Sequence, residues 1–254
     1  MIQRAELEKY LNTLLQPELF NDYGPNGLQI EGKQEIKKIA FSLSATRHSV
    51  ACAVKENADT LICHHGLFWN FHGVRTLTGP FAKRVLPLVR NEINLFGYHL
   101  PLDAQIEMGN AATIAKELGL TNLAPFGDHK GSPTGVKGVF KSKIKASDVK
   151  TKLEKILNHN VLHAVSDQNE IESMGIITGG ANSGWQDAAY EGLDSYLTGE
   201  MSEHDWHESA ESGVHMFAGG HNATEELGIK NLMSYIQAEF SELECFFIEH
   251  NNPA

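Results

Sequence analysis

Apolar residues follow two patterns along the chain, one with helical spacing and one of short continuous runs. The first 15 residues have helical spacing, because Leu7, Leu11, Leu14 and Leu15 recur at intervals of one turn between charged positions. This spacing predicts an amphipathic first helix. The charges that interrupt every apolar run in this segment argue against a signal peptide.

Short apolar runs then alternate with helical stretches through the rest of the chain. In the first half we expect strands at 39–43, 60–65 and 93–99. In the second half the runs predict strands at 174–180, 194–200, 214–221 and 245–250, with a last helix at 224–240. Strands that alternate with helices predict an α/β fold with a largely parallel sheet.

The two halves of the chain repeat the same plan. The segment CAVKENADTLICHH matches AAYEGLDSYLTGE, and INLFGYHLPLD matches VHMFAGGHNATE. We therefore predict two similar α/β lobes that arose by internal duplication. The Gly- and Pro-rich stretch 125–138 is the expected boundary, which gives an N-terminal lobe at 1–125 and a C-terminal lobe at 126–254.

Composition narrows the class of protein. Of 254 residues, 41% are hydrophobic and 21% charged, which is typical of a globular protein with a sizeable core. The net charge of −11 disfavours non-specific binding to nucleic acid, and no apolar run reaches the ~18 residues of a membrane span. Three cysteines without a CxxC pair indicate the reducing cytosol, so we expect a cytoplasmic protein.

Histidines and carboxylates gather where the predicted strands end. Ligands of α/β sheets bind outside the carboxyl ends of the strands, so these positions are candidates for chemistry. The four strand ends carry, in chain order, His64 with His65, His99 with Asp103, Glu200 with Glu203 and His204, and His221 with Glu225.

Imidazoles and carboxylates without thiolates suit Zn, Mn, Fe, Co or Ni rather than a closed structural zinc site. Two such ions about 3.5–4 Å apart could share Glu225 as a bridge and activate water. Each pair also has an explanation without a metal. Two adjacent histidines can be structural residues of a strand, and an HxxxE pair at the start of a helix can be a cap or an exposed ion pair. Their joint occurrence at four strand ends favours metal binding.

Other residues near these strand ends leave two explanations open. Glu200 and His204 could serve as general acid or base or support a ligand, whereas Glu203 fits the solvated start of a helix. Just past the histidine pair, Trp69, Phe71, His72 and Arg75 could stack on a purine and meet phosphate, or fill the interface between lobes.

Six motifs follow one another along the chain: GPNGLQIEG (24–32), LICHHGLFW (61–69), GYHLPLDA (97–104), TGGANSGW (178–185), LTGEMSEHD (197–205) and GGHNATE (219–225). Together they resemble the NIF-three-like family, whose members are often described as GTP cyclohydrolase I type 2. The resemblance extends over nearly the whole chain.

This resemblance implies two α/β lobes with a dinuclear metal site in the cleft between them. It assigns His65 and Asp103 to one ion, His64 and His221 to the other, and Glu225 as the bridge. His99 is then a further ligand, a supporting residue or a core histidine. Longer members carry an inserted domain that this chain lacks between its halves, so it resembles the short form.

The function implied by the resemblance is a metal-dependent hydrolase that opens the ring of GTP through a metal-bound hydroxide. Glu225, His99 and His204 are the candidate catalytic residues. The cofactor would be two divalent ions per subunit, and the assembly a ring-like homohexamer. The alternatives are a dinuclear phosphoesterase, which shares the same metal chemistry, and a metal-handling or interaction protein without turnover.

Overall fold

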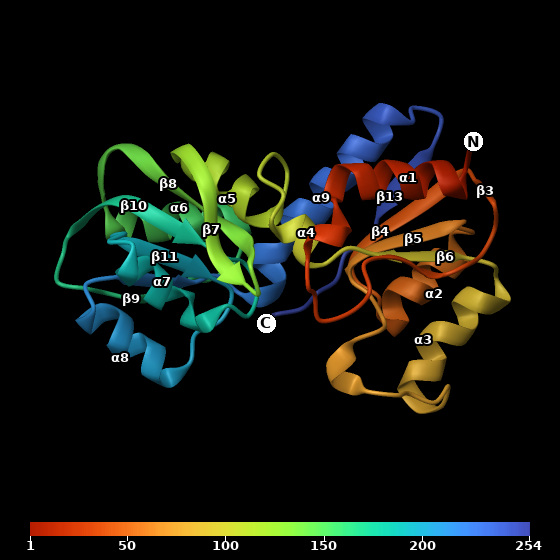
Figure 1. The fold of residues 1–254 in the computed structure, drawn as a ribbon, viewed down its shortest axis with the longest axis horizontal. Helices are drawn as coiled ribbons and strands as arrows, with labels where there is room; N and C mark the ends of the chain where they lie inside the picture. Colours follow the sequence, from red (N-terminus) through yellow and green to blue (C-terminus); the bar gives the residue numbers. More distant parts are fainter. The chain divides into compact units, whose positions relative to one another are not determined.

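Most strands belong to two separate sheets in the computed structural model, which describes residues 1–254 (Figure 1). The first half of the chain builds one sheet and the second half the other, except that the predicted strand at 245–250 joins the sheet of the first half. Residues 1–102 and 229–251 form unit 1, and residues 103–228 with 252–254 form unit 2. The chain leaves unit 1 within α4 (Leu100–Asp103) and returns to it within α9 (His221–Glu239). The α/β fold class predicted from the sequence is confirmed.

Unit 1 contains a five-stranded sheet in the order β13–β4–β5–β6–β2. Its strands are β2 (Gly27–Ile30), β4 (Lys38–Ser44), β5 (Thr60–His65), β6 (Asn94–Gly97) and β13 (Glu244–Phe247). Only β2 runs antiparallel to its neighbour. Because β4, β5 and β6 are central and parallel, nearly all their residues are buried, which explains the continuous apolar runs in the sequence.

Helices cover both faces of the sheet in unit 1 (Figure 1). The last part of α9 and α1 (Arg4–Leu15) cover one face, where Tyr10 and Phe240 meet edge to face at 5.3 Å. On the other face lie α2 (Arg47–Lys55) and α3 (Gly79–Arg90). The predicted stripe of α1 is confirmed, since Leu7 and Leu11 are fully buried. A short antiparallel pair, β1 (Ile2–Gln3) with β3 (Glu35–Ile36), precedes β4.

Unit 2 contains a six-stranded mixed sheet in the order β7–β8–β10–β11–β12–β9. The strands are β7 (Thr121–His129), β8 (Ser132–Lys145), β9 (Leu162–Ala164), β10 (Glu170–Ile176), β11 (Ser195–Thr198) and β12 (His215–Ala218). One apolar core packs α5 (Asn110–Leu118) and α6 (Ala146–Leu157) on the sheet, and a second one involves α7 (Trp185–Tyr190). Helix α8 (Glu203–Glu211) precedes β12.

The Gly- and Pro-rich stretch at 125–138 is part of a long β-hairpin, β7–β8, and not an irregular connection. Its turn uses Lys130 and Gly131, both with positive φ, which suits a tight hairpin turn. Pro125 is tolerated because β7 is the edge strand of the sheet. The boundary predicted at 125/126 falls within β7, whereas the units divide at 102/103 and 228/229.

The two units share a β–α–β–α–β segment with three adjacent parallel strands. In unit 1 this is β4–α2–β5–α3–β6, and in unit 2 it is β10–α7–β11–α8–β12. The matched segments of the sequence occupy equivalent places in the two series. The duplication itself stays a prediction. None of the helices combines the length and the apolar character that a membrane crossing requires.

Candidate functional site

Three histidines of unit 1 converge at the carboxyl ends of β5 and β6. His64 and His65 are the last residues of β5, and His99 follows β6 after the residue Tyr98. One ring nitrogen of each lies within 4.8 Å of those of the other two, and the ring centres are 4.6–5.6 Å apart. We call these three residues the imidazole cluster. His64 is completely buried.

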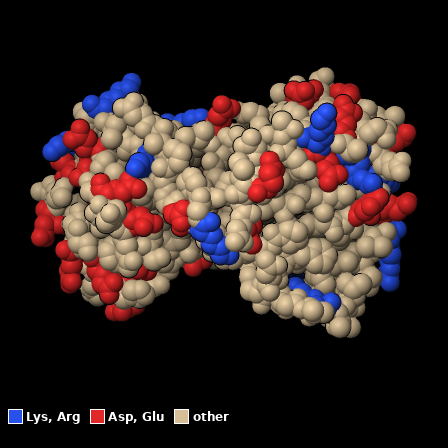
Figure 2. All heavy atoms as spheres, in the orientation of Figure 1, with Lys and Arg blue, Asp and Glu red and all other residues tan.

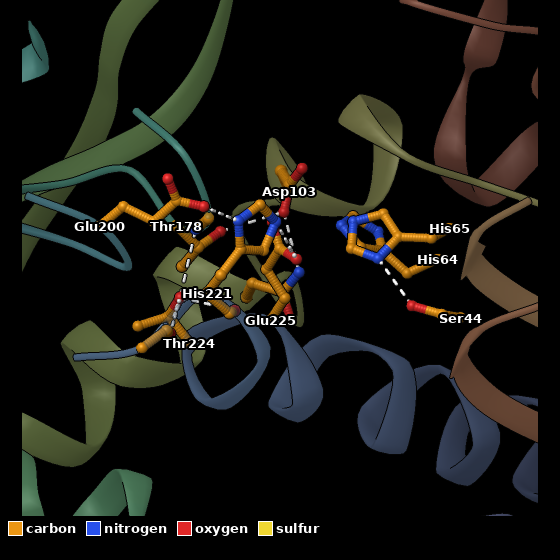
Figure 3. A network of polar contacts seen from close by, with 12 residues as sticks. Ser44, His64, His65, Asp103, Thr178, Glu200, His221, Thr224 and Glu225 are labelled. Carbon is orange, nitrogen blue, oxygen red and sulfur yellow. Dashed lines mark hydrogen bonds and ion pairs between the residues drawn. The ribbon is translucent and has the colours of Figure 1, made fainter. Parts of the chain in front are cut away.

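Each ring of the imidazole cluster is held through its Nδ1 atom by an oxygen. Nδ1 of His64 donates to the Tyr98 carbonyl at 3.0 Å, because a carbonyl can only accept. Nδ1 of His65 lies 3.0 Å from the Ser44 hydroxyl (Figure 3). With Nδ1 engaged in this way, Nε2 is the nitrogen that can coordinate an ion, which is the usual arrangement of metal-ligating histidines.

The third ring, His99, is held by Asp22, a residue that the spacing of motifs did not single out. Its Nδ1 donates to a carboxylate oxygen of Asp22 at 2.7 Å, and the backbone amide of Leu100 donates to the other oxygen at 2.9 Å. Burial acts to raise the pKa of Asp22, but the hydrogen bonds from His99, Asn26 and the Tyr23 amide outweigh it and lower that pKa. Asp22 is therefore a carboxylate that orients His99.

In unit 2 a histidine and three carboxylates gather at the carboxyl ends of β10, β11 and β12, and we call Asp103, Glu200, His221 and Glu225 the acid–imidazole group. Nδ1 of His221 lies 2.6 Å from Glu200, and Nε2 lies 3.1 Å from Glu225, one turn further along α9 (Figure 3). Asp103 is buried, and it accepts hydrogen bonds from Asn110 and Thr178 at 2.8 and 3.1 Å.

The turn after β10 is shaped to make room for Glu225. Gly179 has φ +68°, and a Cβ added there would lie 2.1 Å from Oε1 of Glu225 and 3.2 Å from Nε2 of His221. Thr224 fixes the turn against α9, because its hydroxyl accepts the Gly179 amide at 3.2 Å. The glycine of the TGG motif is therefore required by steric contact with the acid–imidazole group.

Electrostatics of this group favour a positive charge at His221. Its pKa is raised to about 9, chiefly by the hydrogen bond from the ring to Glu225, with Glu200 adding to the effect against burial. The same two carboxylates that stabilise an imidazolium would stabilise a bound divalent cation, which would replace the proton on Nε2.

The donor set fits a divalent transition metal. It combines imidazoles with oriented rings and buried carboxylates, the ligands that Zn, Mn, Fe, Co and Ni accept. Cys63, next to His64, does not join the set, because complete burial raises its pKa far above neutrality and keeps the thiol protonated. The residues present are thus able to hold metal ions.

The structure places the predicted site residues in three locations. His64, His65 and His99 form the imidazole cluster, and Asp103, His221 and Glu225 belong to the acid–imidazole group with Glu200. His204 is exposed on α8, where its Nε2 lies 3.5 Å from Asp205, and Glu203 is more exposed still. The ion pairs of His204 and Glu203 are thus with other residues of α8 and not with the acid–imidazole group.

The sequence did not predict the residues that hold these candidate ligands in place. They are Asp22, Ser44, Asn110 and Thr178. Asp22 lies two positions before the GPNGLQIEG motif and Thr178 opens TGGANSGW, so the motifs themselves were the available signal. Ser44 and Asn110 lie outside the motifs, and nothing in the sequence marks them.

Comparison with known sequences finds one family. The model of Duf34/NIF3 (NGG1p interacting factor 3) matches residues 2–253. The GTP cyclohydrolase 1 type 2 homolog of Haemophilus influenzae is 41% identical over 255 residues, which cover 100% of both chains. The protein of the same name from Pasteurella multocida is 39% identical over 252 residues, which cover 98% of each chain.

Comparison with solved structures agrees in fold over the full length. The protein ybgI, described as of unknown function, superposes with a TM-score of 0.92 at 35% identity, covering 100% of both chains. TTHA1606 from Thermus thermophilus gives a TM-score of 0.89 at 30% identity, again covering 100% of both chains. The arrangement of elements described above is therefore common to these proteins.

Proposed function

Because the chain belongs to the Duf34/NIF3 family, we propose that it is a dinuclear metal-dependent hydrolase acting on a nucleotide. The names of its relatives point to the ring opening of GTP as the reaction. The proposed ligands of two divalent ions are His64, His65, Asp103, His221 and Glu225, with Glu225 bridging.

This proposal rests on one observation, the oxygen contact at Nδ1 of each imidazole. Unrelated core histidines have no reason to present the same ring nitrogen to an oxygen. In the imidazole cluster, however, all three rings are held at Nδ1 by an oxygen and so direct Nε2 toward coordination. Metal-ligating histidines usually have such a partner at the second ring nitrogen, and metal binding would explain why all three rings have one.

The remaining residues have roles that follow from their contacts. Bound divalent ions supply Lewis acidity and activate water as a nucleophile near neutral pH. Ser44 and Asp22 orient His65 and His99, and a proton held on Nδ1 of His221 by Glu200 would leave Nε2 to hold an ion. His99 is a candidate further ligand for one of the two ions. For His204 the role of general acid or base stays a prediction from the sequence, because its side chain is exposed on α8.

The proposal is tested by a product-resolved assay with GTP. Purified protein is reconstituted with Mn, Zn or Fe and compared with a Glu225→Ala variant treated identically. We expect formate and a pterin precursor from the intact protein and none from the variant, because loss of the bridge disorders both ions. Full activity of Glu225→Ala would overturn the proposed mechanism.

The products also separate the proposal from its alternatives. Release of phosphate without formate would identify a dinuclear phosphoesterase, which uses paired ions for in-line displacement. Two tightly bound ions without any turnover, together with stoichiometric transfer of metal to an apo acceptor, would identify a metal-handling protein. Either result contradicts the assignment to GTP ring opening.

A further inference from the structure

The segment after β5 exposes aromatic and apolar side chains in unit 1. Phe71 is 69% exposed, Val74 is fully exposed and Leu77 is 53% exposed. A single exposed apolar residue is ordinary, but three within seven positions of one segment indicate a surface that binds a ligand or another molecule. We call Trp69, Phe71, His72 and Arg75 the aromatic strip.

The members of the aromatic strip contact one another in sequence. The rings of Trp69 and Phe71 are stacked, with centres 5.7 Å apart and planes at 20°. Phe71 meets His72 at 4.6 Å, and Nη1 of Arg75 lies 3.2 Å from Nδ1 of His72. The strip therefore joins two nearly parallel aromatic rings to a guanidinium group.

The aromatic strip also adjoins the imidazole cluster. The Trp69 ring packs edge to face on His99 at 5.1 Å and lies 6.1 Å from His65, while its Nε1–H donates to the Gly66 carbonyl. A small hollow beside these rings is lined in part by His64, Trp69 and His99. It is far smaller than an ordinary ligand pocket, so a ligand of nucleotide size must lie mainly on the exposed strip.

Charge in this part of the chain suits an anion. Residues 60–91 contain four Lys or Arg residues and no carboxylate, within a chain of net charge −11. The guanidinium of Arg75 packs over the Phe81 ring at 4.0 Å, which holds it in place. In Figure 2 the surface over α3 and the segment before it is mostly tan, with basic side chains at its margin.

We propose that the aromatic strip binds the substrate as a mononucleotide, with the base stacked on Phe71 and Trp69 and a phosphate paired with Arg75. A ligand that uses both halves of the strip must carry a planar ring and an anion, which describes a nucleotide. The inference rests on the proposed function for the reaction that follows, but the binding itself does not depend on turnover.

The test is equilibrium binding to the metal-loaded protein, followed by tryptophan fluorescence. The ligands are GTP, guanosine and inorganic tripolyphosphate, which separate the base from the phosphates. Trp69 is one of three tryptophans, so Trp69→Phe identifies its share of the signal and Trp206→Phe serves as the control. We expect GTP to quench the tryptophan fluorescence of the wild type and of Trp206→Phe. In Trp69→Phe most of this quenching should be lost.

Two further variants separate stacking from charge. Phe71→Ala should weaken GTP binding about tenfold or more, because the stacking of a base on an aromatic ring is lost. Arg75→Gln should weaken GTP and tripolyphosphate but leave guanosine unchanged. The matched control is Tyr190→Ala, which removes a 93% exposed aromatic from unit 2 and should leave binding unchanged.

The outcomes decide the proposal independently of catalysis. Unchanged GTP affinity in Phe71→Ala would overturn it, as would tighter binding of a single-stranded oligonucleotide than of GTP. A fall in oligomer mass of Phe71→Ala by light scattering, with guanosine affinity retained, would instead make the strip an interface between copies. If binding depends on the strip but no formate is released, this inference holds and the proposed reaction is wrong. As a control, the metal content should be equal in every variant.

Discussion

At the scale of single residues, the candidate ligands are restricted by neighbouring side chains and backbone groups. His64, His65 and His99 would each be free to choose between two ring nitrogens, but an oxygen at Nδ1 removes that choice. Gly179 has to be a glycine, because any side chain there would occupy the place of the Glu225 carboxylate. The positions of these candidate ligands therefore depend on the residues that contact them.

Gly179→Ala tests this steric requirement. Alanine there would be strained by φ +68° and would push Glu225 aside, so we expect lower stability and weaker metal binding. Gly192→Ala is a matched control, because its φ is +71° but nothing lies within 4 Å of the added Cβ. Thermal unfolding and metal titration of both variants measure the difference. Equal metal affinity in the two would contradict the steric account.

At the scale of elements, the sequence predicted strands and helices from burial and could not predict long-range partners. The runs at 60–65 and 93–99 correspond to β5 and β6, because central parallel strands are apolar throughout. The hairpin β7–β8 was missed because its glycines and prolines are also typical of loops. Asp22 and His99 lie 77 positions apart, so no local spacing reveals their hydrogen bond.

The pairing of β9 with β12 carries a pH dependence. Nε2 of His215 donates to the Gln168 carbonyl, so its Nδ1 accepts from Nε2 of His163, which lies 3.0 Å away. Burial, with His215 and Lys150 adding, lowers the pKa of His163 to about 4. The neutral ring thus contributes stability above pH ~6.5, the unfolded value, and this contribution is lost as the pH falls toward 4.

We therefore expect the unfolding temperature of the wild type to fall between pH 7 and pH 4, and to fall less in His163→Gln. The glutamine cannot take up the proton that the unfolded histidine binds in acid. His207→Gln, which replaces an exposed histidine, is the control and should follow the wild type. Differential scanning calorimetry across this range gives the comparison. The same fall in His163→Gln as in the wild type would exclude His163 as the source.

At the scale of the whole molecule, two properties matter: where the acidic side chains lie on the surface and how many copies of the chain assemble. Acidic side chains gather over α7 and α8 of unit 2 (Figure 2), and α8 carries four carboxylates without a Lys or Arg. We predict a homohexamer with a mass about six times the 28.0 kDa of one chain. Light scattering coupled to size exclusion measures that mass, and a monomer at every concentration would contradict it.

We propose that this chain holds two divalent ions through its histidines and carboxylates, and this binding can be measured without any substrate. It is tested most directly by the metal content of dialysed protein, measured by plasma mass spectrometry for the wild type, Glu225→Gln and the exposed control Glu203→Gln. We predict two ions per chain in the wild type and the control, and loss of both ions in Glu225→Gln. Two ions retained by Glu225→Gln, or none bound by the wild type after reconstitution, would contradict the account.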